Sequence, residues 1–338
     1  MKLNYKEAPA CNARLFALAL RWVIGWTYFS AFWRRLVLEN KLIPGEAGYI
    51  GEKFNHFLPN ALGIKPIIEY LVSHPDSLHA SMVAFTIVEA IVGLLMILGL
   101  FTRLMSLGVM LLAMGILLGS GWLGTTCLDE WQIGVLGIAG GFTIFLSGSS
   151  IFSIDHYLVK NDHPVSRIKW FSMIGSGPFP FKNQRQLVLI SSMLIAAITL
   201  FTNQYFHGGV WGKLHNKSVQ PKVEISDIRY DAGELHFQLF RTEGADVYGS
   251  FLIEIAVLNE NGATVLSLGQ KNLSQFPQEN IRNHYIAKIK PGKHSLEIPL
   301  GAKADMSMPI EGLNRRQKYA IRLTDISGII WEAAFSTN

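Results

Sequence analysis

The amino-acid sequence predicts a membrane-embedded four-helix bundle with a fifth, anchoring transmembrane helix, followed by an all-β sandwich domain of immunoglobulin-like type outside the membrane. The composition supports the membrane part, because 49% of the 338 residues are hydrophobic and only 16% are charged, whereas soluble domains carry about 25% charged residues. Beyond residue 219 charges return at ordinary density and hydrophobic residues alternate with a period of two, which predicts β-strands. The stretch 81–150 contains only four charged residues, Glu89, Arg103, Asp129 and Glu130.

Five segments are apolar enough to cross a bilayer, which requires about 20 mostly apolar residues. The first contains Arg21 and ends in Arg34-Arg35 rather than in a small-residue cleavage site, so we interpret it as a retained span and not as a signal peptide. A shorter amphipathic segment, 65–72, predicts an interfacial or re-entrant helix in the first loop. The five spans are 15–33, 82–101, 104–123, 131–148 and 187–206.

The basic residues predict the orientation of these spans, because Lys and Arg accumulate on the cytoplasmic side. The N-terminal head and the connection between the fourth and fifth spans are both basic, whereas the loop 122–131 has no Lys or Arg. We therefore expect a cytoplasmic N-terminus and a periplasmic or extracellular C-terminal domain. Cys11 and Cys127 would then lie on opposite sides, which excludes a disulfide between them. The predicted regions are a four-helix transmembrane domain (1–160), a cytoplasmic linker (161–186), a fifth transmembrane helix (187–206) and an outer β domain (207–338).

The outer domain shows clear strand and turn signals. In FLIEIAV (251–257) every second residue is large and apolar, as in a strand with one buried face. Asn261-Gly262 follows and predicts a tight hairpin into ATVLSLG. About seven short strands predict an immunoglobulin-like sandwich. The other candidate strands are KVEISDIRY, ELHFQLFR, KYAIRLTD and GIIWEAAF.

Several function classes lack support in the sequence. The region 81–150 has no histidine, and the ten histidines of the chain show no metal-ligand spacing, so we predict no haem and no metal site. No glycine-rich nucleotide fingerprint appears, and we predict no flavin. The net charge of +5 forms no basic block, which argues against nucleic-acid binding. Redox chemistry would therefore use a thiol, a diffusible lipid cofactor or a partner.

Cys127, in GWLGTTCLDEWQIG, is the first candidate for such chemistry. The thiolate is the reactive form of cysteine, and nearby cations favour it. Asp129 and Glu130 oppose ionisation, so a cation such as Arg34 or Arg35 would be needed. The alternative is that Cys127 is only a small residue in a turn between two helices.

Glu89 and Arg21 are ionisable residues within predicted spans, where such groups usually face the bundle interior with a partner. One interpretation is an Arg21–Glu89 ion pair, although the two residues are offset by roughly 9 Å along the membrane normal. The other is that Glu89 accepts a proton beside a redox cofactor. Arg103 lies at the cytoplasmic turn and is expected to anchor the end of its helix.

The remaining candidate residues are basic and aromatic. Paired guanidinium groups suit an oxyanion substrate, because each donates several hydrogen bonds in a fixed fork. Tryptophans near the interface are commonly belt residues, and some could line a flat slot for a quinone ring. We assign Cys127, Glu89 and Glu130 to catalysis, Arg34, Arg35, Arg21 and Asp129 to substrate binding, and Trp22, Trp26, Trp122 and Trp131 to quinone binding.

Three sequence elements resemble the DoxD family in the same order, namely ALRWVIGWTYFSAFWRRL, FTIVEAIVGLLMILGLFTRLMSL and GWLGTTCLDEWQIG. The part that follows the fifth span resembles DoxA, so the two resemblances cover the chain from about residue 14 to its end. They imply a thiosulfate:quinone oxidoreductase in a bacterial or archaeal inner membrane. Such an enzyme oxidises two thiosulfates to tetrathionate and reduces a membrane quinone of the menaquinone or ubiquinone type.

A covalent route through Cys127 is one hypothesis for this reaction. One thiosulfate would be held as Cys–S–S–SO3⁻ while two electrons pass to quinone, and a second thiosulfate would attack its sulfane sulfur and release tetrathionate. The alternatives are a non-catalytic DoxX-like membrane subunit whose outer domain docks a periplasmic partner, and an enzyme that oxidises sulfide or an organic thiol. A transporter would need more spans than one chain offers, which a homodimer could supply.

Overall fold

The computed structural model describes residues 13–46, 48–124, 129–177, 183–215, 217–245, 250–314 and 316–337. The chain divides into two compact units, each built from segments that are far apart in the sequence. We call them the helical unit and the β unit. The helical unit comprises Met1–Ile50, His79–Gly121 and Asp129–Leu214, and the β unit comprises Gly51–Leu78, Trp122–Leu128 and His215–Asn338.

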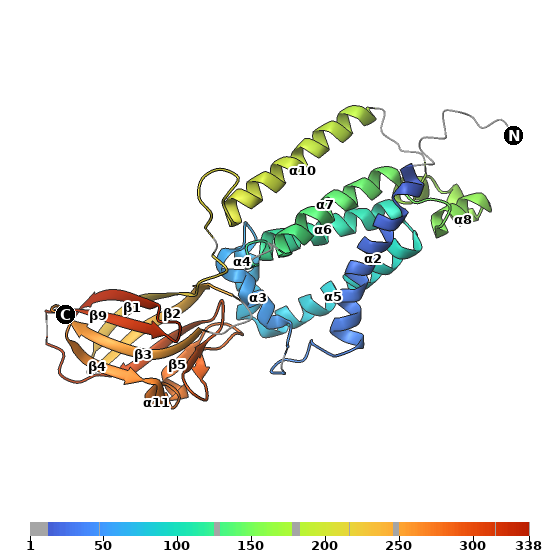
Figure 1. Ribbon diagram of the computed structural model, residues 1–338. Helices are drawn as coiled ribbons and strands as arrows, with labels where there is room; N and C mark the ends of the chain where they lie inside the picture. The colour runs from blue at the N-terminus through green and yellow to red at the C-terminus, as the bar shows by residue number, and fades with distance from the viewer. Residues whose placement is uncertain are drawn as a thin grey trace. The chain divides into compact units, whose positions relative to one another are not determined.

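In the part of the chain that the structure describes, four helices are long and apolar enough to cross a membrane, α5, α6, α7 and α10 (Figure 1). They belong to the helical unit, apart from the first turn of α5. The expected first span forms a 15-residue helix, α2, which continues into a π-helix, η1. Its role as a span, and with it the count of five, stays a prediction. The elements are α2 (Leu18–Phe32), η1 (Trp33–Val37), α5 (Pro75–Leu98), α6 (Thr102–Ser120), α7 (Asp129–Ser147), α8 (Ile154–Lys160), η3 (Pro164–Arg167), α9 (Lys169–Ile174) and α10 (Gln184–Phe206).

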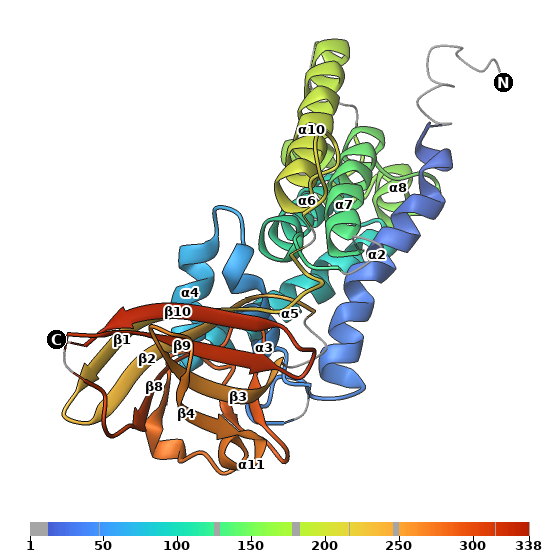
Figure 2. The same ribbon diagram turned by 60° about the vertical axis from the view of Figure 1, so that its left-hand side comes forward.

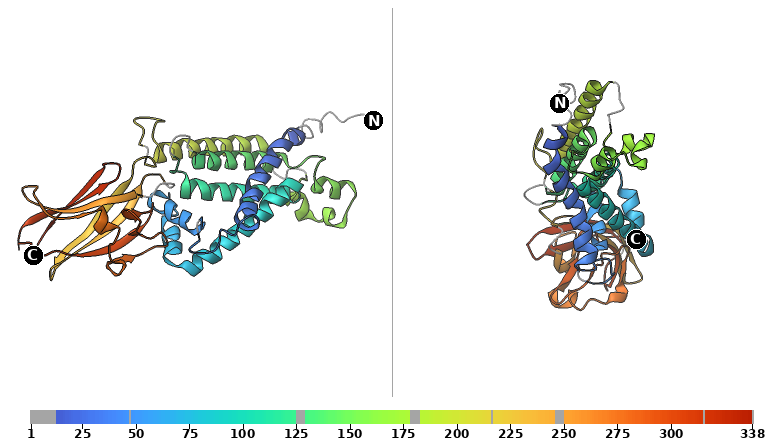
Figure 3. Two further views of the ribbon diagram at one scale, coloured as in Figure 1. Left: turned by 60° about the horizontal axis from the view of Figure 1, so that its bottom comes forward. Right: turned by 90° about the vertical axis from the view of Figure 1, so that its right-hand side faces the viewer.

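Apolar side chains occupy both the inside and the outside of the helical unit. Helices α6 and α7 run side by side (Figures 1 and 3), and their short connection makes them antiparallel neighbours. Trp131 of α7 donates a hydrogen bond from its indole nitrogen to Thr202 Oγ1 of α10 at 3.0 Å. The outward face of α10 exposes Leu189, Ile190, Met193, Leu194 and Phe201. The buried cluster contains Ile24, Tyr28, Val92, Met96, Met105, Val109, Leu112 and Ile144 from α2, α5, α6 and α7.

Helices α2 and α5 cross at two glycines. A Cβ atom on Gly93 would collide with the backbone of Phe29 and Gly25, and a Cβ on Gly25 would lie 2.9 Å from the backbone nitrogen of Ile97. Small residues at such crossings allow helix backbones to approach closely within a membrane. This crossing fixes the part of α2 that leads into η1 against α5.

The β unit contains an antiparallel β domain of two sheets with an apolar core between them (Figure 2). One sheet has the strand order β1-β2-β8-β5, and the other has the order β10-β9-β3-β7-β6, with β4 also paired to β3. The strands are β1 (Lys222–Asp231), β2 (Glu234–Glu243), β3 (Ser250–Asn259), β4 (Thr264–Gly269), β5 (Ile281–Asn283), β6 (Lys290–Pro291), β7 (Leu296–Ile298), β8 (Lys303–Pro309), β9 (Lys318–Asp325) and β10 (Ile330–Ser336), with short helices α11 (Gln270–Leu273) and η4 (Gln278–Asn280).

The six strands whose sequences were predicted are confirmed. They are β1, β2, β3, β4, β9 and β10. The hairpin signal is confirmed as well, because Asn259 donates its backbone N–H to Ala263 O at 2.9 Å and Gly262 adopts φ +77°. Four apolar helices followed by an all-β domain therefore agree with the predicted fold class. The immunoglobulin-like subtype and the four domain boundaries stay predictions.

Three short helices of the first loop belong to the β unit rather than to the helical unit. They are α3 (Gly51–Phe57), η2 (Leu58–Asn60) and α4 (Lys65–Ser73). Helix α4 is amphipathic as predicted. The expectation that it lies at the membrane interface or re-enters the membrane stays a prediction. Ile68 and Val72, on the apolar face of α4, pack against Leu58, Ala61 and Tyr285.

Candidate functional site

A buried ion pair lies within the helical unit between η1 and α5. Nη1 of Arg35 lies 2.5 Å from Oε2 of Glu89, and it also donates to Oγ1 of Thr86 at 3.1 Å. The Glu89 side chain is 5% exposed and the Arg35 side chain 17% exposed. The guanidinium carbon of Arg35 lies 5.9 Å from the centre of the Phe85 ring, within the range of a cation–π contact. A carboxylate and a guanidinium are thus held together in an apolar setting.

The π-helix explains why Arg35 and not Arg34 reaches this carboxylate. The backbone N–H of Leu38 bonds to Trp33 O at 2.9 Å, a spacing of five residues that widens the turn. Arg34 stays exposed, and its Nε donates to Ser30 O of the preceding turn at 3.3 Å. The two neighbouring arginines predicted for one anion site therefore have different surroundings, because Arg34 is exposed and Arg35 is half-buried.

The expected ion pair between Arg21 and Glu89 is wrong, because Glu89 pairs with Arg35. Arg21 is 2% exposed, and its Nη2 donates to Phe152 O at 2.6 Å. Among the described residues, Nε and Nη1 of Arg21 have no hydrogen-bond partner. Arg35 lies fourteen positions after Arg21, which corresponds to about 21 Å along a helix. The two arginines therefore cannot contact the same small anion.

A second polar cluster in the helical unit involves Asp155, which sequence reasoning missed. This fully buried carboxylate accepts hydrogen bonds from the backbone N–H groups of Phe101 and Thr102 at 2.9 and 3.1 Å, and so caps α6. It also accepts from the hydroxyls of Thr102 and Ser176, each at 2.8 Å. The sequence did contain a signal for this contact. Helix α6 starts after Phe101, which has no side chain that can cap it, so a capping group from elsewhere was needed.

Arg103, the residue after this cap, is buried, and its expected role as an anchor at this turn stays a prediction. It is 2% exposed, and it donates to the carbonyl oxygens of Phe145 at 3.2 Å and Gly177 at 2.8 Å. Backbone carbonyls can hold a guanidinium that is withdrawn from water, because its five N–H groups need acceptors. The contacts of Thr102 and Arg103 therefore hold α6 to neighbouring segments of the chain.

The four predicted quinone-binding tryptophans have three different environments. Trp22 and Trp26 are 49% and 56% exposed on α2. Trp131 is half-buried and is bonded to α10, as described above. Trp122 belongs to the β unit, is 1% exposed, and donates from Nε1 to Phe57 O at 3.2 Å.

The loop that carries Cys127 is described only up to Gly124. Cys127 lies outside the described residues, as does the side chain of Asp129, and Cys11 also lies outside them. Glu130 is half-buried in the first turn of α7. Within the β unit, Ser218 donates from its hydroxyl to Gly124 O at 2.5 Å. The described end of this loop is therefore fixed by the β unit.

A groove of about 610 Å³ lies over the sheet β1-β2-β8-β5 of the β domain, and sequence reasoning did not find it. Asp305 accepts hydrogen bonds there from Gln238 Nε2 at 2.8 Å and His284 Nε2 at 2.9 Å. Partial burial opposes ionisation, but these bonds outweigh it and hold the pKa of Asp305 below its ordinary value. The charged residues that line the groove are Asp227, Arg229, Asp231, His236, Glu279, Arg282 and Asp305.

Within the described part of the chain, no group of three or more His, Cys, Asp or Glu residues is arranged to hold a metal ion. The comparison with known families gives two matches. The family model described as "TQO small subunit DoxD" matches residues 16–203, and the one described as "TQO small subunit DoxA" matches residues 206–334. TQO stands for thiosulfate:quinone oxidoreductase.

Proposed function

Because the chain belongs to the DoxD family and carries a DoxA domain in the same polypeptide, we propose that it oxidises thiosulfate to tetrathionate and passes the electrons to a membrane quinone. The balanced reaction consumes two thiosulfate dianions, one quinone and two protons, and yields tetrathionate and the quinol. The orientation that we propose has the N-terminus in the cytoplasm and the β domain outside, so that thiosulfate is oxidised at the outer face.

The single observation that carries this proposal is the buried pair of Glu89 and Arg35. Quinone reduction in an apolar site needs a group that delivers protons, and a carboxyl group within hydrogen-bond reach of the ring oxygens is suited to it. Arg35 balances the charge of Glu89 when that carboxyl group has lost its proton. Thr86 accepts a hydrogen bond from the same guanidinium nitrogen and fixes its position.

Aromatic side chains of the helical unit could contact the flat quinone ring, whose two oxygens need polar partners such as Glu89. Phe85 lies beside Arg35, and Trp22 and Trp26 expose aromatic surface on α2. When bound, the quinone accepts two electrons and two protons. In our proposal these aromatic residues of the helical unit, together with Trp131, hold the ring, and Glu89 supplies protons, with Glu130 of α7 as a second donor.

The proposed substrate groups are the exposed arginine and the thiol. The Arg34 guanidinium attracts the thiosulfate dianion. Arg21 is buried about 21 Å from Arg35 along the helix, so it is left out of the proposed substrate site. The thiolate of Cys127 forms a bond to the terminal sulfur of one thiosulfate, and the electron pair released by this oxidation passes to quinone. A second thiosulfate then attacks the sulfur next to the sulfonate, which releases tetrathionate and regenerates the thiolate.

The test is thiosulfate-dependent reduction of a short-chain quinone analogue by the purified full-length protein, with tetrathionate measured in parallel. We expect Glu89→Gln to lower turnover by about 100-fold or more, the usual effect of losing a general acid or base. The matched control is Glu39→Gln, because the Glu39 side chain is 63% exposed and its ion pair among the described residues is with the exposed Lys41. This variant should keep its turnover within about twofold.

Cys127→Ser tests the covalent route in the same assay, and we expect it to form no tetrathionate. Full turnover in that variant would discard the Cys127 intermediate and keep the oxidoreductase. No activity in folded wild-type protein with quinone present would favour the second candidate, a non-catalytic membrane subunit whose β domain docks a partner. The observation that favours this second candidate is the charged groove of the β domain, which offers a surface for a partner.

A further inference from the structure

The boundary between the two family matches does not coincide with the boundary between the compact units. The DoxD match ends at residue 203 and the DoxA match begins at residue 206. Yet Gly51–Leu78, which lies inside the DoxD match, folds in one unit with the DoxA-matched domain. The first loop of one family is therefore packed on the domain of the other.

A buried asparagine forms the centre of this contact. Asn55 of α3 is fully buried, and its Nδ2 donates to Gly301 O at 3.0 Å. Its Oδ1 accepts from the backbone N–H of Ala287 at 3.1 Å. Gly301 adopts φ +75°, and a Cβ atom there would collide with the backbone carbonyl of Asn55. Both polar groups of the amide are thus satisfied by one specific partner surface.

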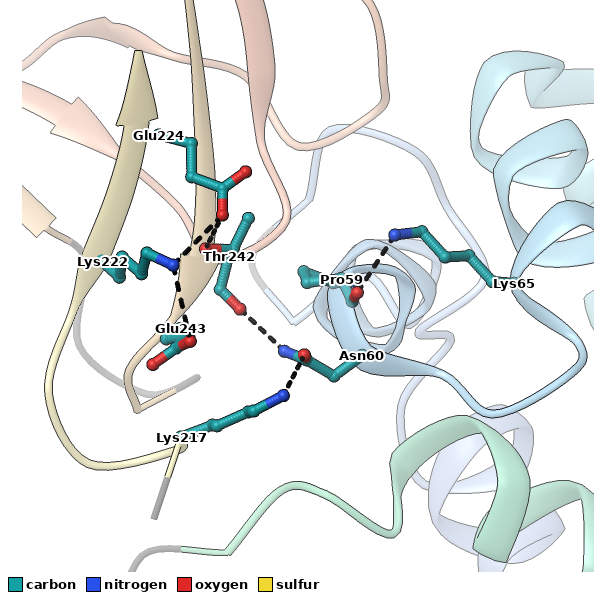
Figure 4. A network of polar contacts seen from close by, with 8 residues as sticks. All are labelled: Pro59, Asn60, Lys65, Lys217, Lys222, Glu224, Thr242 and Glu243. Atoms are coloured by element: carbon teal, nitrogen blue, oxygen red, sulfur yellow. Dashed lines mark hydrogen bonds and ion pairs between the residues drawn. The ribbon is translucent and has the colours of Figure 1, made fainter. Parts of the chain in front are cut away.

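Further polar contacts surround this asparagine. Tyr285 donates from its hydroxyl to Glu69 Oε1 of α4 at 2.7 Å. Asn60 donates from Nδ2 to Thr242 O at 2.9 Å, and Lys217 Nζ donates to Asn60 Oδ1 at 3.3 Å, as the close view in Figure 4 shows. The loop helices are thereby connected to the end of β2 and to the chain that leads into β1.

An apolar cluster completes the contact. Leu58, Ala61, Ile68 and Val72 of the first loop are buried together with Tyr285, and Phe240 of β2 packs against them. On the opposite face of α4 the neighbouring residue Ile67 is 62% exposed. Ile67 and Ile68 therefore differ in burial while sharing one helix.

These observations point to a docking surface. Helices of seven, three and nine residues are too short to be stable alone, and a buried asparagine without partners would be costly. We infer that residues 51–73 are a non-covalent docking surface whose occupant is the chain's own C-terminal β domain. This surface holds the β domain even when the covalent connection through α10 is cut. This docking does not depend on the proposed thiosulfate oxidation, so an experiment can contradict either one without contradicting the other.

The experiment cuts that connection in the complete protein. A protease recognition sequence inserted between Gly212 and Lys213 lies where Trp211 and Leu214 are 63% and 75% exposed. The full-length protein, tagged at its N-terminus, is purified in detergent, cleaved and recaptured on the tag. We expect the C-terminal fragment to be retained with the N-terminal fragment. Its release from the otherwise unaltered protein overturns the inference.

Matched variants show whether the named surface is responsible. We expect Asn55→Ala and Ile68→Ala each to raise the released fraction after cleavage at least tenfold, and Ile67→Ala to leave it unchanged. Tyr285→Phe, which removes only a hydroxyl group, should raise release severalfold and remains informative if a larger change prevents folding. Equal release from the Ile67 and Ile68 variants, with both proteins folded before cleavage, contradicts the assignment.

Discussion

The helical unit and the β domain differ in how much large apolar surface they expose. Helix α10 exposes large apolar residues such as Leu194, whereas Leu235, Phe237 and Leu239 of β2 are at most 2% exposed. The helical unit buries the carboxylates of Glu89 and Asp155 among its helices. Apolar surface that faces hydrocarbon gains little from further burial, so helix contacts in a membrane depend on close packing and on polar partners. In the β domain the hydrophobic effect supplies the main stabilisation.

Burial therefore has a different physical meaning in each region. A buried leucine is expected inside the β domain and marks no function. A buried carboxylate between apolar helices is costly unless it is paired, and such residues are retained where chemistry needs them. The Arg35–Glu89 pair is therefore the feature of the helical unit that calls for a functional explanation.

The largest expected effect on stability is a loss of packing in the β domain. Phe237→Ala should lower the free energy of unfolding by about 3–5 kcal/mol, because a fully buried ring leaves a cavity. Leu194→Ala, on the exposed face of α10 (58% exposed), should change it by less than about 0.5 kcal/mol. Denaturant unfolding of the detergent-solubilised protein measures both. Equal effects would break the contrast between the two regions.

Two ion pairs of equal length sharpen the comparison. Arg35–Glu89 and Arg322–Glu332 each have a nitrogen–oxygen distance of 2.5 Å, but the Arg322 and Glu332 side chains are 36% and 45% exposed. Arg35→Gln should cost about 3 kcal/mol, because it leaves a buried carboxylate without its partner. Arg322→Gln should cost less than about 1 kcal/mol. A similar loss of thermal stability in both variants would show that burial does not set the value of these pairs.

The smallest expected effect concerns the hydroxyl of Tyr285. Burial, then the hydrogen bond to Glu69 and the charge of that carboxylate, raise the pKa of Tyr285 above its ordinary value, which is about 10. A raised pKa in the folded state stabilises the protein fully at pH values below the unfolded pKa, and this contribution is lost as the pH rises through the folded pKa. Tyr285→Phe should therefore cost about 1 kcal/mol near neutral pH.

The difference in melting temperature between wild type and Tyr285→Phe should shrink as the pH is raised above about 10. Tyr230, whose hydroxyl donates to a backbone carbonyl of Ile310, offers the control variant Tyr230→Phe in the same domain. A difference for Tyr285 that stays constant across the alkaline range would contradict the stated role of Glu69.

Local patterns in the sequence predicted much of the fold. Apolar runs of helix length predicted the four spanning helices, and period-two alternation predicted six strands, because both signals depend only on neighbouring residues. Strand β8 was missed although Ala304, Met306 and Met308 alternate inward, since short segments of this kind are stable only between partners. Strands β5, β6 and β7 have three residues or fewer and carry too little pattern to be recognised.

The sequence by itself determined that Glu89 needs a buried partner, because an acid within an apolar span cannot stay unpaired. Only the tertiary structure decided that the partner is Arg35 and not Arg21. The reason is geometric, since the Gly25–Gly93 crossing and the π-helix direct Arg35 toward α5. In the same way, the periodicity of 65–72 predicted an amphipathic helix, but only the packing of distant segments could place its apolar face on the β domain.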